Sequence, residues 1–335
     1  MENGKKPLIV SGMQPTGSLH IGNWAGSLKN WLSLQDAHPG QCVFFIADYH
    51  AMTIDDDPAL RPGRILDLAA TFLAMGIDPK RSLLFVQSDV PECAELTWIL
   101  NTVTPVSEML KMTQYKDKAV RNEKNVNMGL LDYPVLQAAD ILLYGGTAVP
   151  VGEDQVQHVE TTRTVAKAFN RRFGETFAEP QALLTETSRV KSLTEPTAKM
   201  SKSHGPKSYL ALDDTPEEIA AKLAHVPTEP TGQVTEEKLA TEAYAGVALL
   251  FDLLAMFGST DEKKAALAGK TVRYGDLKRR AAEAVADGLV DYREKKTALM
   301  KDPKKVRKIL DAGAKKARKI AVATMEDVCK KTGLR

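Results

Sequence analysis

Short apolar runs alternate with segments of helical periodicity in the first half of the chain. Runs with the length and continuity of strands buried on both faces lie at 8–11, 42–47 and 82–87. Segments with helical spacing follow these runs at 18–35, 61–75 and 93–102. Strands that alternate with helices predict right-handed crossovers and a parallel sheet with helices on both faces. Ligands of such sheets bind beyond the carboxyl ends of the strands.

The second half of the chain is mostly helical. From about 105 to 148 the pattern becomes helical, and a strand signal returns at 147–151. Helices are then expected at 216–225, 236–256, 260–267, 274–287 and 306–331. We therefore predict the α/β class: a Rossmann-like doubly wound parallel sheet with a helical insertion, followed by an all-helical C-terminal domain.

The composition is that of a reduced, globular protein. The 335 residues are 43% apolar, which is enough for a buried core in one large or two ordinary domains. Cys42, Cys93 and Cys329 are odd in number and lack metal-ligand spacing. The apolar run near the N-terminus is too short for a signal peptide, and no run of about 18 apolar residues exists. We therefore expect a cytoplasmic protein that does not insert into a membrane.

Basic residues gather at the C-terminus. Residues 293–335 contain 15 Lys and Arg against 5 Asp and Glu, a local net charge of +10. Because the whole chain has a formal charge of +2, residues 1–292 carry −8. Such a run is typical either of a solvated helix face or of a surface that contacts phosphates, and both interpretations stay open.

A turn rich in glycine follows the first predicted strand and leads into the sequence His-Ile-Gly-Asn at 20–23. Unpaired N–H groups at a helix start favour negative charge, and glycines let a triphosphate approach the backbone. Ser18 occupies the position where a P-loop needs lysine, so the cation must come from elsewhere. Lys199 and Lys202, on a loop flanked by serines, are suited to supply it.

These two stretches resemble the His-Ile-Gly-His and Lys-Met-Ser-Lys-Ser signatures of class I aminoacyl-tRNA synthetases. Further motifs, which resemble those of the bacterial tryptophanyl-tRNA synthetases in order and spacing, lie at 11–17, 112–118, 133–144 and 149–155. The resemblance covers essentially the whole chain. It implies activation of L-tryptophan by ATP to tryptophanyl-adenylate, release of pyrophosphate, and transfer to tRNA(Trp).

Adenylate formation needs positioning and charge stabilisation of phosphates rather than a nucleophilic side chain. His20 and Asn23 lie at i and i+3, where both can donate to the triphosphate, and the two lysines can neutralise it. The resemblance adds Lys118 to these catalytic residues. The ATP contacts that it implies are Gln14, Pro15, Thr16, Gly22, Asn23, Gly152, Glu153, Asp154, Val190, Lys199, Met200, Ser201, Lys202 and Ser203. We expect Mg²⁺ to accompany ATP on phosphates and water, because no carboxylate cluster suggests a metal site built by the protein.

Four polar side chains form one stripe of a predicted helix: Tyr133, Gln137, Asp140 and Tyr144. Pro134 suits the first position of that helix, and Gly145 suits its end. The resemblance implies that Asp140 accepts the indole N–H, which can only donate, and that Tyr133 and Gln155 meet the α-ammonium. The tryptophan site that it implies is Val10, His50, Tyr133, Gln137, Asp140, Ile141, Val149, Val151 and Gln155.

Gln137 departs from the family pattern, since bacterial tryptophan enzymes often carry Met there. The pattern Tyr-x3-Gln-x2-Asp also occurs in archaeal-type tyrosyl-tRNA synthetases, but those place a tyrosine on the first strand, where this chain has Val10. A tyrosyl-tRNA synthetase is one alternative, and Val10 argues against it. A non-catalytic, synthetase-like protein that binds RNA is another, and the intact signature residues argue against it: His20, Asn23, Lys199 and Lys202.

The resemblance also implies the order of domains. We expect a catalytic Rossmann domain at 1–203, with its helical insertion at about 89–148, and a helical anticodon-binding domain at 204–303. A C-terminal helix at 304–335 is expected to pack back on the catalytic domain. A homodimer is implied as well.

Overall fold

The computed structural model describes residues 7–121, 126–185, 190–258, 260–269 and 271–335. The chain forms two compact units. The first unit comprises Met1–Gly17, Asn30–Glu186 and Leu299–Arg335, and the second comprises Ser18–Lys29 and Thr187–Ala298. The boundary at 186 lies before the predicted domain boundary at 203, and a short N-terminal segment belongs to the second unit.

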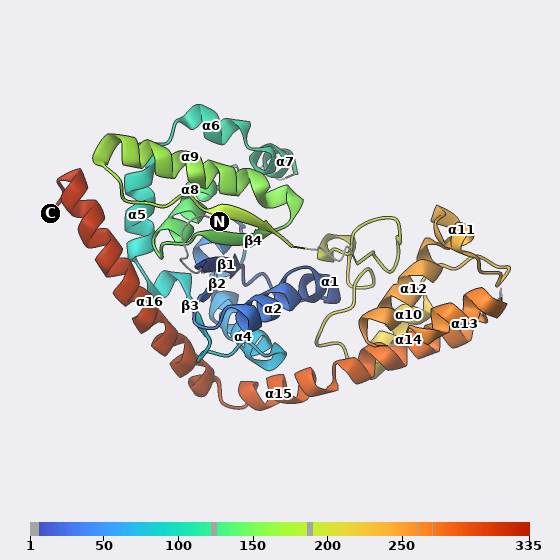
Figure 1. The fold of residues 1–335 in the computed structure, drawn as a ribbon. Coiled ribbons are helices and arrows are strands. Elements are labelled where there is room, and N and C mark those ends of the chain that lie inside the picture. Colours follow the sequence, from blue (N-terminus) through green and yellow to red (C-terminus); the bar gives the residue numbers. More distant parts are fainter. Residues whose placement is uncertain (1–6, 122–125, 186–189, 259, 270) are drawn as a thin grey trace. The chain divides into compact units, whose positions relative to one another are not determined.

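A five-stranded parallel sheet forms the centre of the first unit (Figure 1). Its strands are β1 (Ile9–Met13), β2 (Cys42–Ile46), β3 (Ser82–Val86), β4 (Ala148–Val151) and β5 (Gln181–Leu184). They are ordered β3-β2-β1-β4-β5, and all neighbours are parallel. This strand order agrees with the predicted doubly wound parallel sheet. The sequence pattern does not predict β5, because this edge strand is mostly exposed and lacks a buried apolar run.

Helices cover both faces of the sheet. On one face, Trp31 of α2 (Lys29–Ala37) stacks on Phe44 of β2 at 4.5 Å between ring centroids, and Phe72 of α4 (Arg61–Met75) lies 5.2 Å from Trp31. Side chains of a strand alternate between faces, so Val43 and Phe45 join the opposite core. That core includes α5 (Glu92–Asn101), α8 (Met128–Leu142) and α9 (Val156–Phe173).

The predicted helical insertion is confirmed between β3 and β4. It contains α5, α6 (Val106–Lys111), α7 (Thr113–Arg121) and α8. The predicted start of α8 at Pro134 is wrong, because this helix begins at Met128 and has Pro134 in its interior. The Asn127 side chain accepts from the Leu130 N–H at 3.0 Å and so caps the helix a turn and a half earlier.

The C-terminal helix α16 (Pro303–Thr332) packs against β3 in the first unit. A Cβ at Gly313 would lie 1.9 Å from the Leu84 carbonyl oxygen, so this contact requires glycine. Arg307 forms an ion pair with Asp89 at 2.7 Å. The remaining short elements of this unit are α3 (Asp48–Ala51), η2 (Pro58–Leu60), η3 (Gln87–Asp89) and η5 (Glu153–Gln155).

Helices are the main regular elements in the described part of the second unit. After the first signature come α1 (Ile21–Asn23) and the π-helical η1 (Trp24–Leu28); later come η6 (Lys202–His204), α10 (Pro216–Ala224), α11 (Glu236–Leu239), η7 (Glu242–Tyr244), α12 (Ala245–Met256), α13 (Asp261–Gly269), α14 (Tyr274–Gly288) and most of α15 (Val290–Met300). The predicted all-helical C-terminal domain is thereby confirmed. Trp24 of η1 stacks on Phe257 at 5.4 Å.

Three details of the helical prediction differ from the structure. The single helix predicted at 18–35 begins at Ile21 and is π-helical at η1, a widening for which the sequence carries no signal. The helix predicted at 236–256 is broken between α11 and α12, because the Thr241 backbone is extended there. The sequence pattern does not predict α15, because this helix buries few apolar residues. Within the described ranges, no helix has the length and apolar character needed to span a membrane.

Candidate active site

The two signatures contact each other within the second unit, although 179 residues separate His20 from Lys199 in the sequence. The segment around His20 pairs with a later segment: Ile21 N–H donates to the Leu210 carbonyl at 2.9 Å. Met200 lies beside Gly22, since a Cβ at Gly22 would be 3.7 Å from the Met200 Cβ. The structure thus joins both predicted phosphate-binding stretches.

His20 and Asn23 cap the start of α1 reciprocally. The His20 Nδ1 accepts from the Asn23 N–H at 3.2 Å, and the Asn23 Oδ1 accepts from the His20 N–H at 3.1 Å. Since Nδ1 accepts, the hydrogen of a neutral imidazole lies on Nε2. The side-chain donors directed away from this cap are therefore the His20 Nε2–H and the Asn23 Nδ2. A Cβ at Gly22 would lie 2.9 Å from the His20 Nδ1, so glycine gives the ring its room.

His20 is neutral at physiological pH. Burial, followed by the nearby charges of Lys202 and Lys199, lowers its pKa from 6.5 to about 4. Its residue exposure is 7%. A neutral imidazole near these two lysines can donate a hydrogen bond through Nε2 without adding a third positive charge.

The loop with the second signature is anchored at both ends. Met200 N–H donates to the Val190 carbonyl at 2.9 Å, and both side chains are buried. The Ser208 hydroxyl donates to the Ser201 carbonyl at 2.8 Å. Between these anchors, Lys202 begins the short η6, and Ser201 accepts from the Ser203 N–H at 3.3 Å. Buried Met200 fixes the loop, while the charged residues on either side of it remain more exposed.

The other predicted ATP contacts lie in the first unit. Gln14, Pro15 and Thr16 follow β1, and Gly152, Glu153 and Asp154 follow β4. Because β1 and β4 are parallel neighbours, both groups lie at the carboxyl edge of the sheet. Lys118 belongs to α7, but its side chain is outside the part of the chain that the structure describes.

Part of the predicted tryptophan site forms a buried polar cluster in the first unit. The His50 Nε2 lies 2.8 Å from the Asp140 Oδ2. The Tyr133 ring meets the His50 ring edge to face at 6.4 Å, and the Tyr133 hydroxyl lies 2.9 Å from the His158 Nε2. Burial raises the pKa of Tyr133 to about 12, so this hydroxyl stays protonated. Tyr133 and Asp140 of the predicted stripe are thus interior residues of α8, with Asp140 only 2% exposed, while Tyr144 is buried just beyond the end of this helix.

Apolar residues of the predicted tryptophan site come from the strands and from α8. Val10, Ile141, Val149 and Val151 are buried in one core. Gln137 is half-buried. Gln155 lies at the end of η5, where its amide donates to the Asp154 carboxylate at 3.0 Å.

Three buried residues of this cluster are missing from the sequence prediction. Gln87 and Cys93 contact Asp140, and His158 contacts Tyr133. His158 lies one helical turn after Gln155, and Gln87 ends the third predicted strand. Gln87 could have been predicted as a site residue from its position at the carboxyl end of a strand. Nothing in the local sequence distinguishes Cys93 from an ordinary buried apolar residue.

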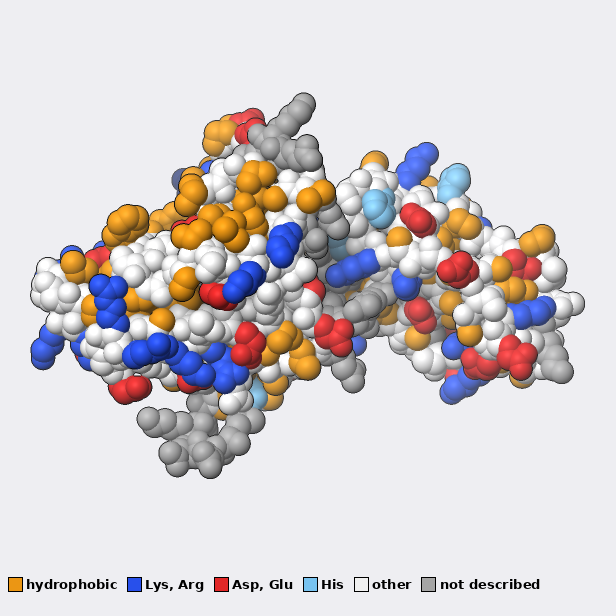
Figure 2. Space-filling model, turned by 90° about the horizontal axis from the view of Figure 1, so that it is seen from above, with side chains coloured by type: hydrophobic (Ala, Val, Ile, Leu, Met, Phe, Trp, Pro, Cys, Tyr) orange, Lys and Arg blue, Asp and Glu red, His pale blue; other side chains and the backbone are white. Residues whose placement is uncertain are grey.

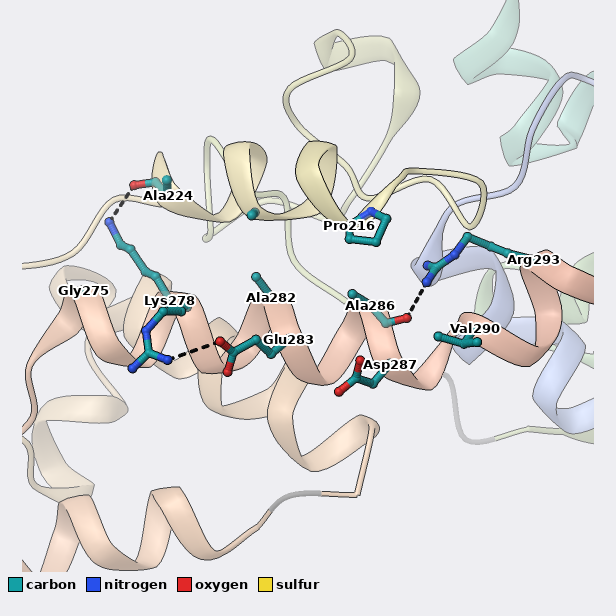
Figure 3. A pocket seen from close by; sticks show the side chains of 12 residues that line it. Pro216, Ala224, Gly275, Lys278, Ala282, Glu283, Ala286, Asp287, Val290 and Arg293 are labelled. Carbon is teal, nitrogen blue, oxygen red and sulfur yellow. Dashed lines mark hydrogen bonds and ion pairs between the residues drawn. The ribbon is translucent and has the colours of Figure 1, made fainter.

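A separate cavity of about 630 Å³ lies between α10 and α14 in the second unit (Figure 3). Its floor contains small residues such as Ala282 and Ala286. Two of its basic side chains are bonded within the protein: Lys278 donates to a backbone carbonyl at 3.0 Å, and Arg279 pairs with Glu283 at 3.2 Å. Arg293 donates through one guanidinium nitrogen to the Ala286 carbonyl at 2.6 Å, and its Nη1 is buried without a hydrogen-bond partner among the described residues. None of the predicted site residues lines it.

The part of the chain that the structure describes contains no group of three or more His, Cys, Asp and Glu side chains that could hold a metal ion. The two stretches that are predicted to bind phosphate contain lysines and neutral donors, which suit the oxygens of a nucleotide.

The fold and the joined signatures define a class I aminoacyl-tRNA synthetase. The model of the family "tRNA synthetases class I (W and Y)" matches residues 2–289, and the chain belongs to this family. It is 43% identical to tryptophan–tRNA ligase of Wolinella succinogenes, over 98% of this chain and 99% of that protein.

Solved structures give the same result. Tryptophanyl-tRNA synthetase of Campylobacter jejuni, complexed with ADP and tryptophan, superposes with a TM-score of 0.86 at 35% identity, covering 97% of this chain and 99% of the other. Tyrosyl-tRNA synthetase of Archaeoglobus fulgidus, complexed with L-tyrosine, has a TM-score of 0.65 at 23% identity over 88% of this chain and 91% of the other, a likeness of fold alone. Of these two structures, the tryptophanyl-tRNA synthetase of Campylobacter jejuni is the more similar to this chain.

Proposed function

We propose that this protein is a tryptophan–tRNA ligase. It activates L-tryptophan with ATP, releases pyrophosphate, and transfers the tryptophanyl group from the adenylate to tRNA(Trp). The observation that carries the proposal is the contact between the segment of His20 and Gly22 and the loop of Met200. The similarity to tryptophan enzymes supports the choice of amino acid.

Activation is an attack of a tryptophan carboxylate oxygen on the α-phosphorus of ATP, with pyrophosphate as leaving group. The protein's task is to stabilise the charge that moves onto the pyrophosphate. Lys199 and Lys202 supply positive charge, and the His20 Nε2–H and the Asn23 amide supply neutral donors. Lys118 is proposed as a further phosphate contact. Mg²⁺ bound with ATP would add charge stabilisation at the phosphates.

The remaining nucleotide contacts are proposed as the resemblance implies. Gly152 lies close to the ribose, and Asp154 accepts from its hydroxyls. The Val190 backbone contacts adenine, and it is held in place by the Met200 N–H. The turn after β1, at 14–16, contacts the triphosphate.

Asp140 is proposed to read the side chain of the substrate. The indole N–H only donates, so a buried acceptor selects it. Tyr133 and Gln155 are proposed to meet the α-ammonium, and Val10 and Val149 to contact the ring.

Transfer RNA and a second copy of the chain are the proposed macromolecular partners, and the proposed location is the cytoplasm. The helical domain at 204–303 is proposed to read the anticodon. In α16, Lys304, Lys305 and Lys308 are exposed, whereas Arg307 pairs with Asp89 and Asp311. The lysines are therefore the phosphate-contact candidates, and Arg307 anchors the helix.

Exposed apolar side chains support a homodimer. Figure 2 shows hydrophobic side chains gathered on one face of the first unit. Trp98 and Met128 are both 73% exposed, and Val106 is 62% exposed. Exposed apolar surface of this kind is typical of protein interfaces. Light scattering should show a dimer for the native chain and a monomer for Val106→Asp; a monomeric native chain would contradict the proposal.

Pyrophosphate exchange tests the proposed activity. Purified protein with Mg²⁺ and ATP should exchange pyrophosphate in the presence of L-tryptophan and far less with L-tyrosine. Exchange with tyrosine alone would refute the choice of amino acid. Exchange with neither amino acid would favour a non-catalytic RNA-binding protein.

A further inference from the structure

The Asp140 carboxylate is surrounded by three donors from three different elements. Its Oδ1 accepts from the Gln87 Nε2 at 2.7 Å and from the Cys93 thiol at 3.0 Å. Its Oδ2 lies 2.8 Å from the His50 Nε2. All four side chains are buried, and all belong to the first unit.

The direction of each hydrogen bond follows from its surroundings. The Gln87 Oε1 accepts from the Tyr49 N–H at 3.1 Å, so the amide must turn its NH₂ toward Asp140. Burial, and then the charge of Asp140, raises the pKa of the Cys93 thiol well above its usual range, so the thiol keeps its hydrogen. His50 faces an acceptor through Nε2, which places its ring hydrogen on that nitrogen.

A carboxylate has about four acceptor positions, two on each oxygen. Gln87 and Cys93 together occupy the two positions of Oδ1. His50 occupies one position of Oδ2, so that one acceptor position is left on that atom.

We propose that Gln87 and Cys93 are positioning residues, which saturate the Asp140 Oδ1 and thereby present Oδ2, beside His50, as the single acceptor for the indole N–H. This inference rests on the proposed tryptophan activity. It adds two specificity-determining residues to the site, neither of which touches the substrate.

The effect of removing a donor can be estimated. The contact of the indole N–H with the Asp140 carboxylate is itself a hydrogen bond to a charged group, worth roughly 1.5–3 kcal/mol, so its loss corresponds to about a 10- to 100-fold change in an equilibrium. Gln87→Met keeps the side-chain length and removes the donor. Oδ1 then becomes available, the carboxylate turns, and the contact with the indole N–H weakens.

The decisive readout compares tryptophan with an analogue in which a sulfur atom replaces the indole N–H. The ratio of kcat/KM for the two amino acids in pyrophosphate exchange isolates the N–H contact. Gln87→Met should lower this ratio by about 10- to 100-fold, mainly through the KM for tryptophan, with little change in the KM for ATP. Cys93→Ala should lower it less, because a thiol is a weak donor.

Matched variants separate positioning from packing. Cys93→Ser restores a hydroxyl donor and should recover most of the ratio that Cys93→Ala loses. Cys329→Ala removes another buried thiol, on α16, and should leave the ratio unchanged. An unchanged ratio in Gln87→Met, an equal loss for both amino acids, or a serine variant no better than alanine would each overturn the proposal. If the unmodified protein fails to exchange pyrophosphate with tryptophan, the proposed function itself fails.

Discussion

Protonation of His20 is expected to destabilise the protein in a defined range of pH. The folded chain lowers the pKa of His20 to about 4, from 6.5. As the pH falls, the unfolded chain therefore binds the proton first. The contribution of His20 to stability is complete above about pH 6.5 and is lost as the pH falls from there toward 4.

The structure explains why the folded state resists the proton. Protonation would turn the His20 Nδ1 into a donor that faces the Asn23 N–H at 3.2 Å, and would place a third cation beside Lys199 and Lys202. From these two pKa values, the contribution of His20 to the free energy of unfolding should fall by about 2 kcal/mol when the pH is lowered from about 7.5 to 5.

His20→Asn is the matched variant, because asparagine keeps an N-cap acceptor and does not titrate. Urea denaturation of both proteins should give a difference in the free energy of unfolding that falls by about 2 kcal/mol over this range. Other titrating groups cancel in the difference. NMR of the His20 ring should give a midpoint near 4. A constant difference between the two proteins, or a midpoint near 6.5, would refute this account.

Three further predictions test the phosphate loop, α16 and tRNA binding. Lys202→Ala should lower kcat for pyrophosphate exchange by about 10²–10³-fold with little change in the tryptophan KM; a loss in KM alone would assign the loop to the amino-acid pocket. Gly313→Ala should destabilise by about 1–3 kcal/mol, because its Cβ would lie 1.9 Å from a carbonyl oxygen of β3. Gly63→Ala, in open space on α4, should be neutral or stabilising, and equal effects would contradict the packing argument. Charge reversal at Lys304 and Lys308 should weaken tRNA binding and flatten the dependence of tRNA affinity on the logarithm of the salt concentration, without changing the rate of pyrophosphate exchange. Unchanged tRNA binding would mean that the basic face of α16 is only a solvated helix face.

The features that the sequence alone determined depend on interactions between residues that are close together in the chain. The buried runs of β1, β2 and β3 need only their apolar continuity, and α4 has the predicted bounds because its spacing and its C-terminal Gly76 are local signals. The two phosphate signatures are recognisable for the same reason, since neighbouring residues in the chain carry each of them.

Only the tertiary structure decided how these pieces act together. Contacts between distant segments lower the pKa of His20 and join its turn to Met200, and no window of sequence contains both. Likewise, Asp140 could be selected from its helix stripe, but the donors Gln87 and Cys93 come from η3 and α5. A buried carboxylate must find donors wherever the fold supplies them, so its partners follow from packing in three dimensions rather than from spacing along the chain.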